Sequence, residues 1–330
     1  MDTVRWGIIG TGRMAEAMAR EIEGLHGAGH RLTAIASRHV DAGRVFASRH
    51  GNPAIHRNAA DLAADGSVDA VYVATPHTAH AADVLACVHS GKAALCEKPF
   101  TLNATEAAQV IDAARAHKVF VMEAMWTRFL PAIAALRECL AARVIGDVRM
   151  IVAGGAFIPD LPPDHYLLNR ALGGGVLLDA GVYLISLASL ILGPPTVVHA
   201  VGRLGVTGVD EQDTVVLEHA GGADAVLYVS LRARRPPDLE ILGSEGRIRV
   251  GAPVFRPEHL TVWTPSAGES VRPFPIAGTG YGYQLEAVAE ALRTGTTQCV
   301  HMSLDETLSI MRTLDAVRAR IGMTYPTETR

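Results

Sequence analysis

Residues 4–15 read VRWGIIGTGRMA and decide the fold. An apolar run typical of a buried strand ends at a glycine, and a helical pattern follows at once. Gly10, Gly12 and Ala15 fit the spacing G-x-G-x-x-A. Glycines at these places allow a tight turn and let a pyrophosphate approach backbone N–H groups at the next helix N-terminus. The stretch predicts a dinucleotide-binding turn, whose expected cofactor contacts are Gly10, Thr11, Gly12, Arg13 and Met14.

Strand and helix patterns alternate over the first 125 residues. Continuous apolar strands between amphipathic helices indicate a parallel sheet covered on both faces. The expected strands are 4–10, 32–37, 68–75, 93–97 and 119–124. The expected helices are 13–25, 41–50, 58–65, 79–90 and 103–117. Asn103 and Glu106 have the spacing of a capping box for the last of these helices.

The pattern changes after residue 125. A helix at 130–142 is followed by longer alternating strands, with a helix inserted at 175–192 and another at 303–321. The strands are expected at 148–157, 197–206, 213–220, 224–233 and 259–265, with HAGGADA as a hairpin turn. We therefore predict an α/β protein with two domains. Residues 1–124 form a doubly wound Rossmann domain, and residues 125–330 form an α/β domain with a large, mostly antiparallel open sheet.

Composition narrows the class of protein. The chain has 330 residues, 49% hydrophobic and 19% charged, which is ample for a sizeable core. A net charge of −4 without a basic block argues against nucleic acid as a partner. No signal-peptide pattern and no uncharged apolar run of about 18 residues is evident, so a soluble cytoplasmic protein is expected. Four dispersed cysteines are expected to be reduced thiols.

Ser37 and Arg38 follow the second predicted strand, where the adenosine ribose of a dinucleotide should lie. A site that prefers NAD usually offers a carboxylate here. A hydroxyl and a guanidinium suit a 2′-phosphate instead, because Arg can form a fork of hydrogen bonds to phosphate oxygens. The pair predicts NADP as the cofactor, with NAD still possible, and a surface arginine on a loop is the alternative.

The fourth Rossmann strand ends in VATPHTAH. Thr75 and Pro76 should lie at the carboxyl end of a central strand, where open α/β sheets bind ligands. His77 and His80 follow with a spacing that could suit a metal, but no acidic or cysteine partner is suitably placed. We expect these four residues to contribute to the cofactor site and expect no metal.

Residues 94–100 read ALCEKPF, and Lys98 is one of only three lysines in the chain. The proline should end the strand, so Lys98 would point from a strand end toward the same crevice. A buried lysine can titrate, whereas arginine stays charged. The position favours a proton-transfer role for Lys98, with a solvated loop lysine as the alternative.

A second candidate group lies in LGGGVLLDAGVY, residues 172–183. Asp179 and Tyr183 stand four residues apart, which places both on one face of an apolar helix. Buried polar groups there need partners. A capping aspartate and a core tyrosine are the alternative.

Together these motifs resemble the glucose–fructose oxidoreductase / inositol dehydrogenase (Gfo/Idh/MocA) family. The resemblance covers the glycine turn, E-K-P at 97–99, GGG-x-x-x-D-x-G-x-Y at 173–183 and MTYPTE at 323–328. MEAMWTRFLPA (122–132) and Tyr183 look like the branch of dimeric dihydrodiol dehydrogenases and NADP-dependent D-xylose dehydrogenases. Inositol dehydrogenases carry histidine at the position of Tyr183, so inositol is not the expected substrate.

The resemblance implies an NAD(P)-dependent dehydrogenase or reductase acting on a sugar, polyol or vicinal diol. It implies Lys98, Asp179 and Tyr183 as catalytic residues and Glu97 beside the cofactor. It also implies a substrate pocket bordered by Trp126, Arg128 and Phe157, and a homodimer or homotetramer formed through the C-terminal sheet. Two other functions stay open on this fold: a non-catalytic cofactor-binding regulator, and a glycosidase or epimerase that retains its nucleotide.

Overall fold

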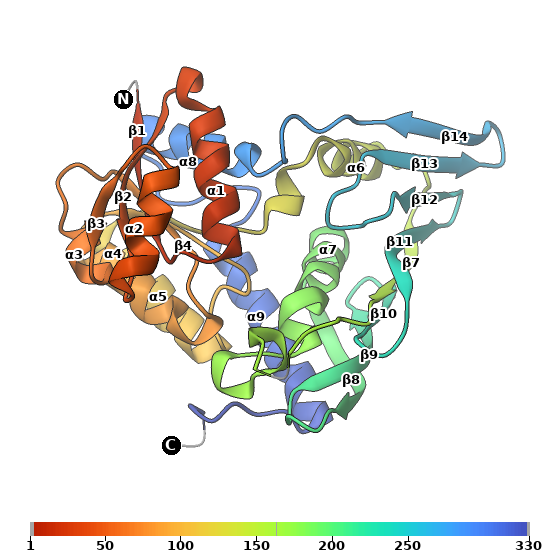
Figure 1. The fold of residues 1–330 in the computed structure, drawn as a ribbon. Helices are drawn as coiled ribbons and strands as arrows, with labels where there is room; N and C mark the ends of the chain where they lie inside the picture. The colour runs from red at the N-terminus through yellow and green to blue at the C-terminus, as the bar shows by residue number, and fades with distance from the viewer. Residues whose placement is uncertain (1–2, 163, 329–330) are drawn as a thin grey trace. The chain divides into compact units, whose positions relative to one another are not determined.

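The computed structural model describes residues 3–162 and 164–328. They form two compact units. One unit consists of Met1–Trp126 with Ala277–Leu308, and the other of Thr127–Ile276 with Ser309–Arg330. Each unit has its own sheet (Figure 1).

The first unit holds a six-stranded parallel sheet in the order β3-β2-β1-β4-β5-β6. This is the strand order of a Rossmann fold, as predicted. The strands are β1 (Val4–Ile9), β2 (His30–Ala36), β3 (Ala54–His56), β4 (Ala70–Val73), β5 (Ala93–Cys96) and β6 (Val121–Glu123). The central strands β4 and β5 are buried at every position, which explains their unbroken apolar runs.

Helices cover this sheet. They are α1 (Arg13–Gly24), α2 (Val40–Arg49), α3 (Ala59–Ala63), α4 (His80–His89), α5 (Ala104–His117) and α8 (Gly282–Thr294). Helix α4 packs between α3 and α5, and α8 packs on α1 and β5. Asn103 caps α5 by accepting a hydrogen bond from the Glu106 N–H, and the Glu106 carboxylate accepts one from the Leu102 N–H. The predicted capping box is therefore confirmed.

The second unit holds an eight-stranded sheet in the order β14-β13-β12-β11-β7-β10-β9-β8. Among the described residues, β7 and β10 are the only neighbouring strands of this sheet that run parallel. The sheet is therefore mostly antiparallel, as predicted. The strands are β7 (Val148–Ala156), β8 (Pro195–Leu204), β9 (Asp210–His219), β10 (Asp224–Ser230), β11 (Arg235–Gly243), β12 (Arg247–Val250), β13 (His259–Thr264) and β14 (Gly268–Pro273). The turn between β9 and β10 is the predicted hairpin.

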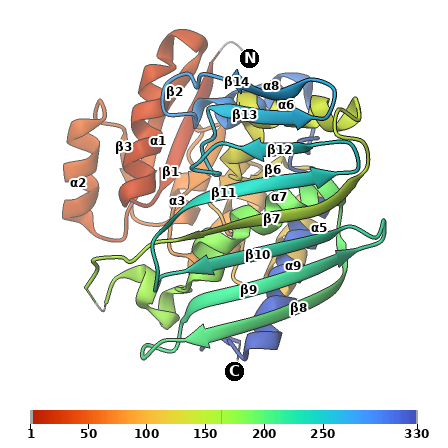
Figure 2. The same ribbon diagram turned by 90° about the vertical axis from the view of Figure 1, so that its right-hand side faces the viewer.

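One face of this sheet is covered by α6 (Pro131–Ala141), a π-helical turn η6 (Leu177–Gly181) and α7 (Val182–Leu192). Helix α9 (Leu304–Ile321) continues from the first unit into the second. Figure 2 looks onto the other face of the sheet, and no helix lies in front of its strands.

Residues 277–308 differ from the sequence-based division, which placed all of 125–330 in one domain. In the structure this segment packs with the Rossmann unit. Glu21 of α1 accepts hydrogen bonds from the Thr279 hydroxyl and the Gly282 N–H, and His30 of β2 contacts Glu286 at 3.2 Å. These contacts hold α8 on the N-terminal sheet.

Residues Arg170–Leu192 are long and apolar enough to cross a membrane, and they contain a stretch of 18 residues with a mean hydropathy of 2.0. However, 67% of that stretch is buried inside the structure. The helix therefore has the surroundings of a core helix in a globular protein.

Candidate active site

The turn after β1 is shaped by its glycines. Gly10 has φ +108°, and a Cβ atom there would lie 2.6 Å from the Ala74 carbonyl oxygen at the end of β4. Gly12, before α1, has no atom within 4 Å of the place where a Cβ would stand. The backbone N–H groups at the start of α1 can thus be approached closely, which is what a pyrophosphate needs. These residues fit a dinucleotide, with Thr11, Arg13 and Met14 at least partly accessible beside them.

Ser37 and Arg38 follow β2. The Ser37 hydroxyl donates to the His39 carbonyl and so holds the turn, while Arg38 is exposed. Asp83 of α4 lies close enough to Arg38 for the arginine charge to lower the pKa of its carboxyl group. The Asp83 carboxylate also accepts a 2.7 Å hydrogen bond from the Thr75 hydroxyl. Burial raises the pKa of Asp83, and the hydrogen bond and Arg38 oppose this shift. Arg38 is therefore an accessible cation at this strand end.

His80 has a structural position. Its ring is fully buried, and its two nitrogens each lie 2.9 Å from a carbonyl oxygen, one of Pro99 and one of Thr75. Burial, with a smaller contribution from the Lys98 charge, lowers the pKa of His80. The neutral ring can donate to only one of the two carbonyls at a time. His80 thus connects the ends of β4 and β5. His77 is also buried, with its ring centroid 5.7 Å from that of His80.

Lys98 follows β5 and is half-buried, and its bond to Pro99 is cis. The neighbouring Glu97 carboxylate accepts hydrogen bonds from the Tyr72 hydroxyl and, at 3.1 Å, from the Lys98 N–H. Glu97 therefore helps to fix the backbone of Lys98, which follows β5 at the carboxyl end of the sheet. Thr75 and Pro76 follow β4, the neighbouring strand.

In the second unit, Asp179 lies in the π-helical turn η6 and Tyr183 in the first turn of α7. Both are half-buried. Asp179 accepts a 3.3 Å hydrogen bond from the Tyr166 hydroxyl, and the Tyr183 ring lies 5.9 Å from that of Phe255. π-Helical turns occur frequently at functional sites. Residues Gly173–Gly175, just before η6, pack closely against the loop 166–169. A Cβ on Gly174 would lie 2.5 Å from the Tyr166 carbonyl oxygen.

Comparisons with known proteins decide the family. Residues 4–125 match the domain described as "Oxidoreductase family, NAD-binding Rossmann fold", and residues 133–249 match the "GFO/IDH/MocA C-terminal domain". The chain belongs to the Gfo/Idh/MocA oxidoreductase family. The resemblance inferred from the sequence motifs is confirmed, and the protein is an NAD(P)-dependent dehydrogenase or reductase.

Family members of known activity are similar over the whole chain. The trans-1,2-dihydrobenzene-1,2-diol dehydrogenase of Bos taurus is 34% identical over 331 residues, covering 98% of each chain. The human enzyme of the same name is 33% identical, covering 99% of each. A 3-ketoreductase from Actinomadura kijaniata, solved in complex with NADP and TDP-benzene, has a TM-score of 0.86 and 26% identity, covering 97% of this chain and 98% of that one.

The three residues predicted to border the substrate have different surroundings. Trp126 is buried, with its ring 4.6 Å from that of Tyr281 in the same unit. Phe157 follows β7 and is 40% exposed. Arg128 is only 2% exposed, and its guanidinium donates to the Ser186 hydroxyl at 2.8 Å and the Ser186 carbonyl at 2.6 Å. Among the described residues no cluster of three metal-ligating side chains occurs.

Arg128→Leu is expected to reduce stability more than substrate affinity. It removes two charge-assisted hydrogen bonds inside the second unit and leaves the Ser186 groups to find new partners. Such bonds contribute about 1.5–3 kcal/mol, which corresponds to roughly 4–10 °C in Tm for a unit of this size. Thermal unfolding and steady-state kinetics measure the two effects. Arg20→Leu, at an exposed ion pair with Glu16, is the control and should change Tm little. A tenfold rise in KM at unchanged Tm would instead give Arg128 a substrate-binding role.

Proposed function

We propose that this enzyme transfers a hydride between NADP and a secondary hydroxyl of a vicinal diol, sugar or polyol, in the cytoplasm. The observation that carries the proposal is the half-buried lysine at the carboxyl end of β5. This position supports a proton-transfer role for Lys98, because open α/β sheets bind ligands at the carboxyl ends of their strands. The names of the similar dihydrodiol dehydrogenases, and the NADP bound to the similar ketoreductase, support the substrate class and the cofactor.

The proposed chemistry divides between the cofactor and the chain. When bound, the nicotinamide would accept the hydride, and Lys98 and Tyr183 would act as a coupled pair that takes the proton of the substrate hydroxyl. A free tyrosine, with a pKa near 10, is a poor base at neutral pH, and a nearby ammonium favours its ionised form. Asp179, oriented by the Tyr166 hydroxyl, would hold the lysine or a substrate hydroxyl. The assignment of the three catalytic residues to one site is part of this proposal.

A substrate screen tests the function. Aldoses, polyols and vicinal diols are each incubated with NADP⁺ and with NAD⁺, and formation of the reduced nicotinamide is followed by its absorbance. We expect turnover with at least one diol or sugar. Absence of net reduction with every compound, in a protein that binds the nucleotide, would favour a regulator or an enzyme that retains its nucleotide.

The double variant Ser37→Asp, Arg38→Ala is expected to reverse cofactor preference. The wild type should prefer NADP⁺ by at least about tenfold in kcat/KM, because hydrogen bonds to a charged group contribute about 1.5–3 kcal/mol and 1.4 kcal/mol is tenfold. The new carboxylate would repel the 2′-phosphate and accept hydrogen bonds from the free ribose hydroxyls.

Arg13→Ala is the matched control for cofactor choice. Arg13 begins α1, beside the place of the pyrophosphate that both cofactors share, so its loss should weaken both cofactors equally. Equal kcat/KM values for NAD⁺ and NADP⁺ in the wild type would mean that Arg38 serves either cofactor, for example by stacking on the adenine.

We propose further that the chain forms a homo-oligomer through the outer face of the second unit's sheet, the face shown in Figure 2. Apolar side chains on that face include Val152, which is 38% exposed, Val197, also 38%, and Val201, 76%. Exposed apolar patches of this kind commonly mark interfaces.

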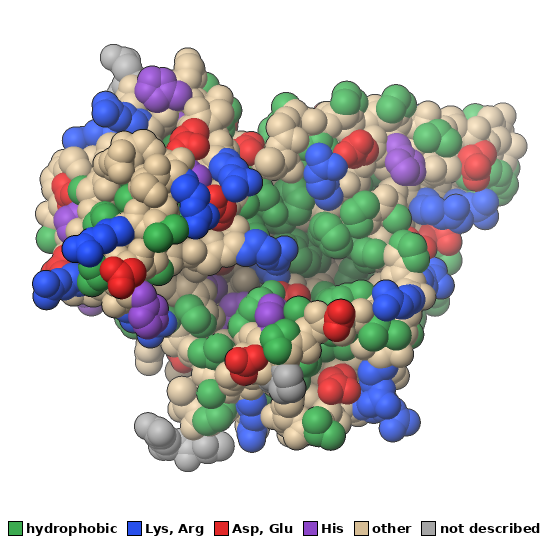
Figure 3. All heavy atoms as spheres, in the orientation of Figure 1, with side chains coloured by type: hydrophobic (Ala, Val, Ile, Leu, Met, Phe, Trp, Pro, Cys, Tyr) green, Lys and Arg blue, Asp and Glu red, His purple; other side chains and the backbone are tan. Residues whose placement is uncertain are grey.

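Lys and Arg are interspersed with Asp and Glu on the surface shown in Figure 3, so this view shows no extended basic surface that would bind nucleic acid.

Val152→Glu should shift the oligomer toward monomer, because it introduces an unpaired charge into the proposed interface. Light scattering at micromolar concentration measures the mass. Val206→Glu is the control, since Val206 is fully exposed in the turn between β8 and β9. A wild-type monomer at that concentration would contradict the proposed assembly.

A further inference from the structure

Two aspartates of β9 lie beneath the segment that carries Asp179 and Tyr183. Asp210 and Asp213 are both completely buried. Strand residues three apart normally point to opposite faces. Here the register between β8 and β9 shifts, so that Leu204 pairs with Asp210 while Arg203 pairs with Gln212. The extra residue, Glu211, forms a bulge that turns both carboxyl groups toward the covered face.

Asp210 contacts the start of the π-helical turn directly. Its Oδ2 accepts a 2.6 Å hydrogen bond from the Leu177 N–H, the first residue of η6. Its Oδ1 fills the space beside Gly175, where a Cβ would lie 2.1 Å away. The Tyr325 hydroxyl donates to the Gly174 carbonyl at 2.8 Å. The backbone that enters η6 is thus held by Asp210 and by the C-terminal segment.

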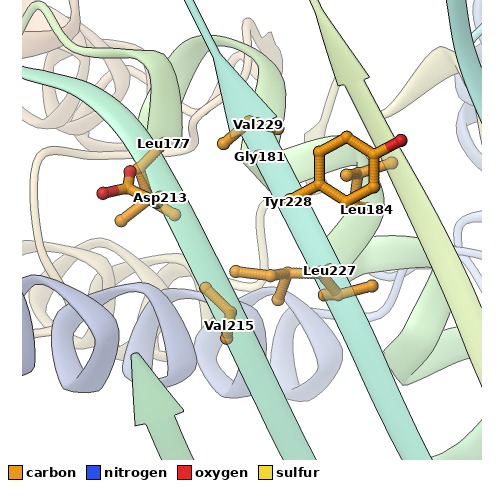
Figure 4. Close-up of a pocket in the computed structure, with 9 residues that line it drawn as sticks. Leu177, Gly181, Leu184, Asp213, Val215, Leu227, Tyr228 and Val229 are labelled. Atoms are coloured by element: carbon orange, nitrogen blue, oxygen red, sulfur yellow. The ribbon is translucent and has the colours of Figure 1, made fainter. Parts of the chain in front are cut away.

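Asp213 completes the arrangement. It occupies room left by Gly202 of β8, and it lines a small pocket together with Leu177 and Gly181 of η6 (Figure 4). Oδ1 of Asp210 and both oxygens of Asp213 find no N–H or hydroxyl donor among the described residues. Two ionised carboxylates in contact inside a protein would be very costly. A proton held between the two groups gives each of them a partner.

The charges around the pair agree with one shared proton. Burial, followed by the Asp210 charge, raises the pKa of Asp213 to about 9. Burial also raises the pKa of Asp210, against the hydrogen bond from Leu177 and the charge of Arg318. Arg318 itself pairs with Asp315 and with Glu328, and Tyr325 has its pKa raised mainly by burial, so it keeps its proton. The Asp213 charge in turn contributes to the raised pKa of Tyr325, after burial and the Asp210 charge.

We propose that Asp210 and Asp213 are a proton-sharing carboxyl pair that positions the π-helical turn, and with it Asp179 and Tyr183, for the reaction. This inference rests on the proposed function for its catalytic consequence. The pair acts through the Leu177 N–H, two residues before Asp179, and touches neither substrate nor cofactor. Asp210 accepts a hydrogen bond from the Leu177 N–H of the turn, and protonated Asp213 donates a hydrogen bond to Asp210.

Three variants separate this role from simple packing. Asp213→Asn keeps a neutral donor toward Asp210 and should leave kcat within about threefold of wild type. Asp213→Leu keeps the branching at Cγ but has no donor, and Asp210→Ala removes the acceptor for the Leu177 N–H. Both should lower kcat at least about tenfold while the cofactor Kd changes less than about threefold. If Asp213→Leu retained wild-type kcat, or Asp213→Asn were as damaging as Asp213→Leu, the inference would be overturned.

Hydrogen exchange tests the same contact without any substrate. Asp210→Ala should accelerate exchange in peptides covering 174–182 and leave peptides of β10 unchanged, whereas Asp213→Asn should leave both unchanged. Unchanged exchange at 174–182 in Asp210→Ala would contradict the positioning role. If the wild type shows no turnover, the proposed function fails, and exchange still decides the inference.

The shared proton has its own signature. Between the ordinary aspartate pKa of 3.8 and about 9, the folded wild type keeps a proton that the unfolded chain releases, so rising pH lowers wild-type stability. Asp213→Asn has no such proton. The Tm of Asp213→Asn minus that of wild type should therefore increase steadily from pH 5 to pH 8. A difference that stays constant over this range would rule out the shared proton.

Discussion

Replacing Lys98 with Met is expected to lower kcat by about 10²–10⁴, the usual contribution of a general acid–base group. Lys98 is half-buried at the carboxyl end of β5, on a backbone fixed by Glu97 and by the neighbouring His80 contact to Pro99. Met keeps most of the aliphatic stem and removes the ammonium. The variant should fold and bind cofactor, since neither the glycine turn nor Ser37 and Arg38 is altered.

Lys118→Met is the matched control for that experiment. Lys118 ends α5, is exposed, and already has φ +55°, so exchanging it for another L-residue changes only a surface charge. Its kcat should equal that of wild type. If Lys98→Met kept more than a tenth of wild-type kcat on the best substrate, Lys98 would have no proton-transfer role.

Gly175→Ala is expected to be strongly destabilising. Gly175 has φ +124°, which L-residues rarely adopt, and the new Cβ would lie 2.1 Å from Asp210 Oδ1. The backbone conformation costs about 1–3 kcal/mol, and overpacking a buried site costs about 1–3 kcal/mol more. Either Asp210 moves away from the Leu177 N–H or the glycine segment shifts. Denaturant unfolding and kcat measure the result, and both should fall.

Gly295→Ala controls for the conformational part alone. Gly295 ends α8 with φ +69°, and nothing lies within 4 Å of its added Cβ. It should lose only about 1–2 kcal/mol and keep its kcat. Equal losses of stability in the two variants would mean that the contact between Gly175 and Asp210 is loose.

The Rossmann unit could be predicted closely because its signals are local. Its central strands are buried on both faces, so they stand out as apolar runs, and the glycine turn and the cap at Asn103 mark helix starts. Strand β3 was not predicted, since its three residues are partly or fully exposed and form no apolar run. Helix α8 was not predicted either, and local sequence does not say that it packs on α1.

The second sheet was predicted less completely. Strand β11 begins with Arg235-Pro236-Pro237, and prolines argue against a strand. The structure accommodates them by a shift of register between Arg235 and Asp238 opposite β7. Strand β14 is exposed at every residue, so it shows no alternation of apolar and polar side chains. Such edge features depend on pairing partners that local sequence does not specify.

For the site, residue types were easier to predict than their surroundings. The spacing of Asp179 and Tyr183 indicated a shared helical face, but it did not reveal the π-helical turn. The burial of His80 and Arg128, and their hydrogen bonds within their own units, were not foreseen either. The aspartate pair of β9 could not be foreseen, because its common orientation depends on one bulge in the pairing with β8.

Isotope transfer tests the central claim most directly. The best diol or sugar from the screen is prepared with deuterium on the carbon that bears the reacting hydroxyl and is incubated with enzyme and NADP⁺. If the enzyme oxidises that carbon by hydride transfer, the NADPH formed carries one deuterium, seen by mass spectrometry as a gain of one mass unit, and Lys98→Met forms it far more slowly. NADPH without deuterium, or deuterium that appears in water, would contradict the account.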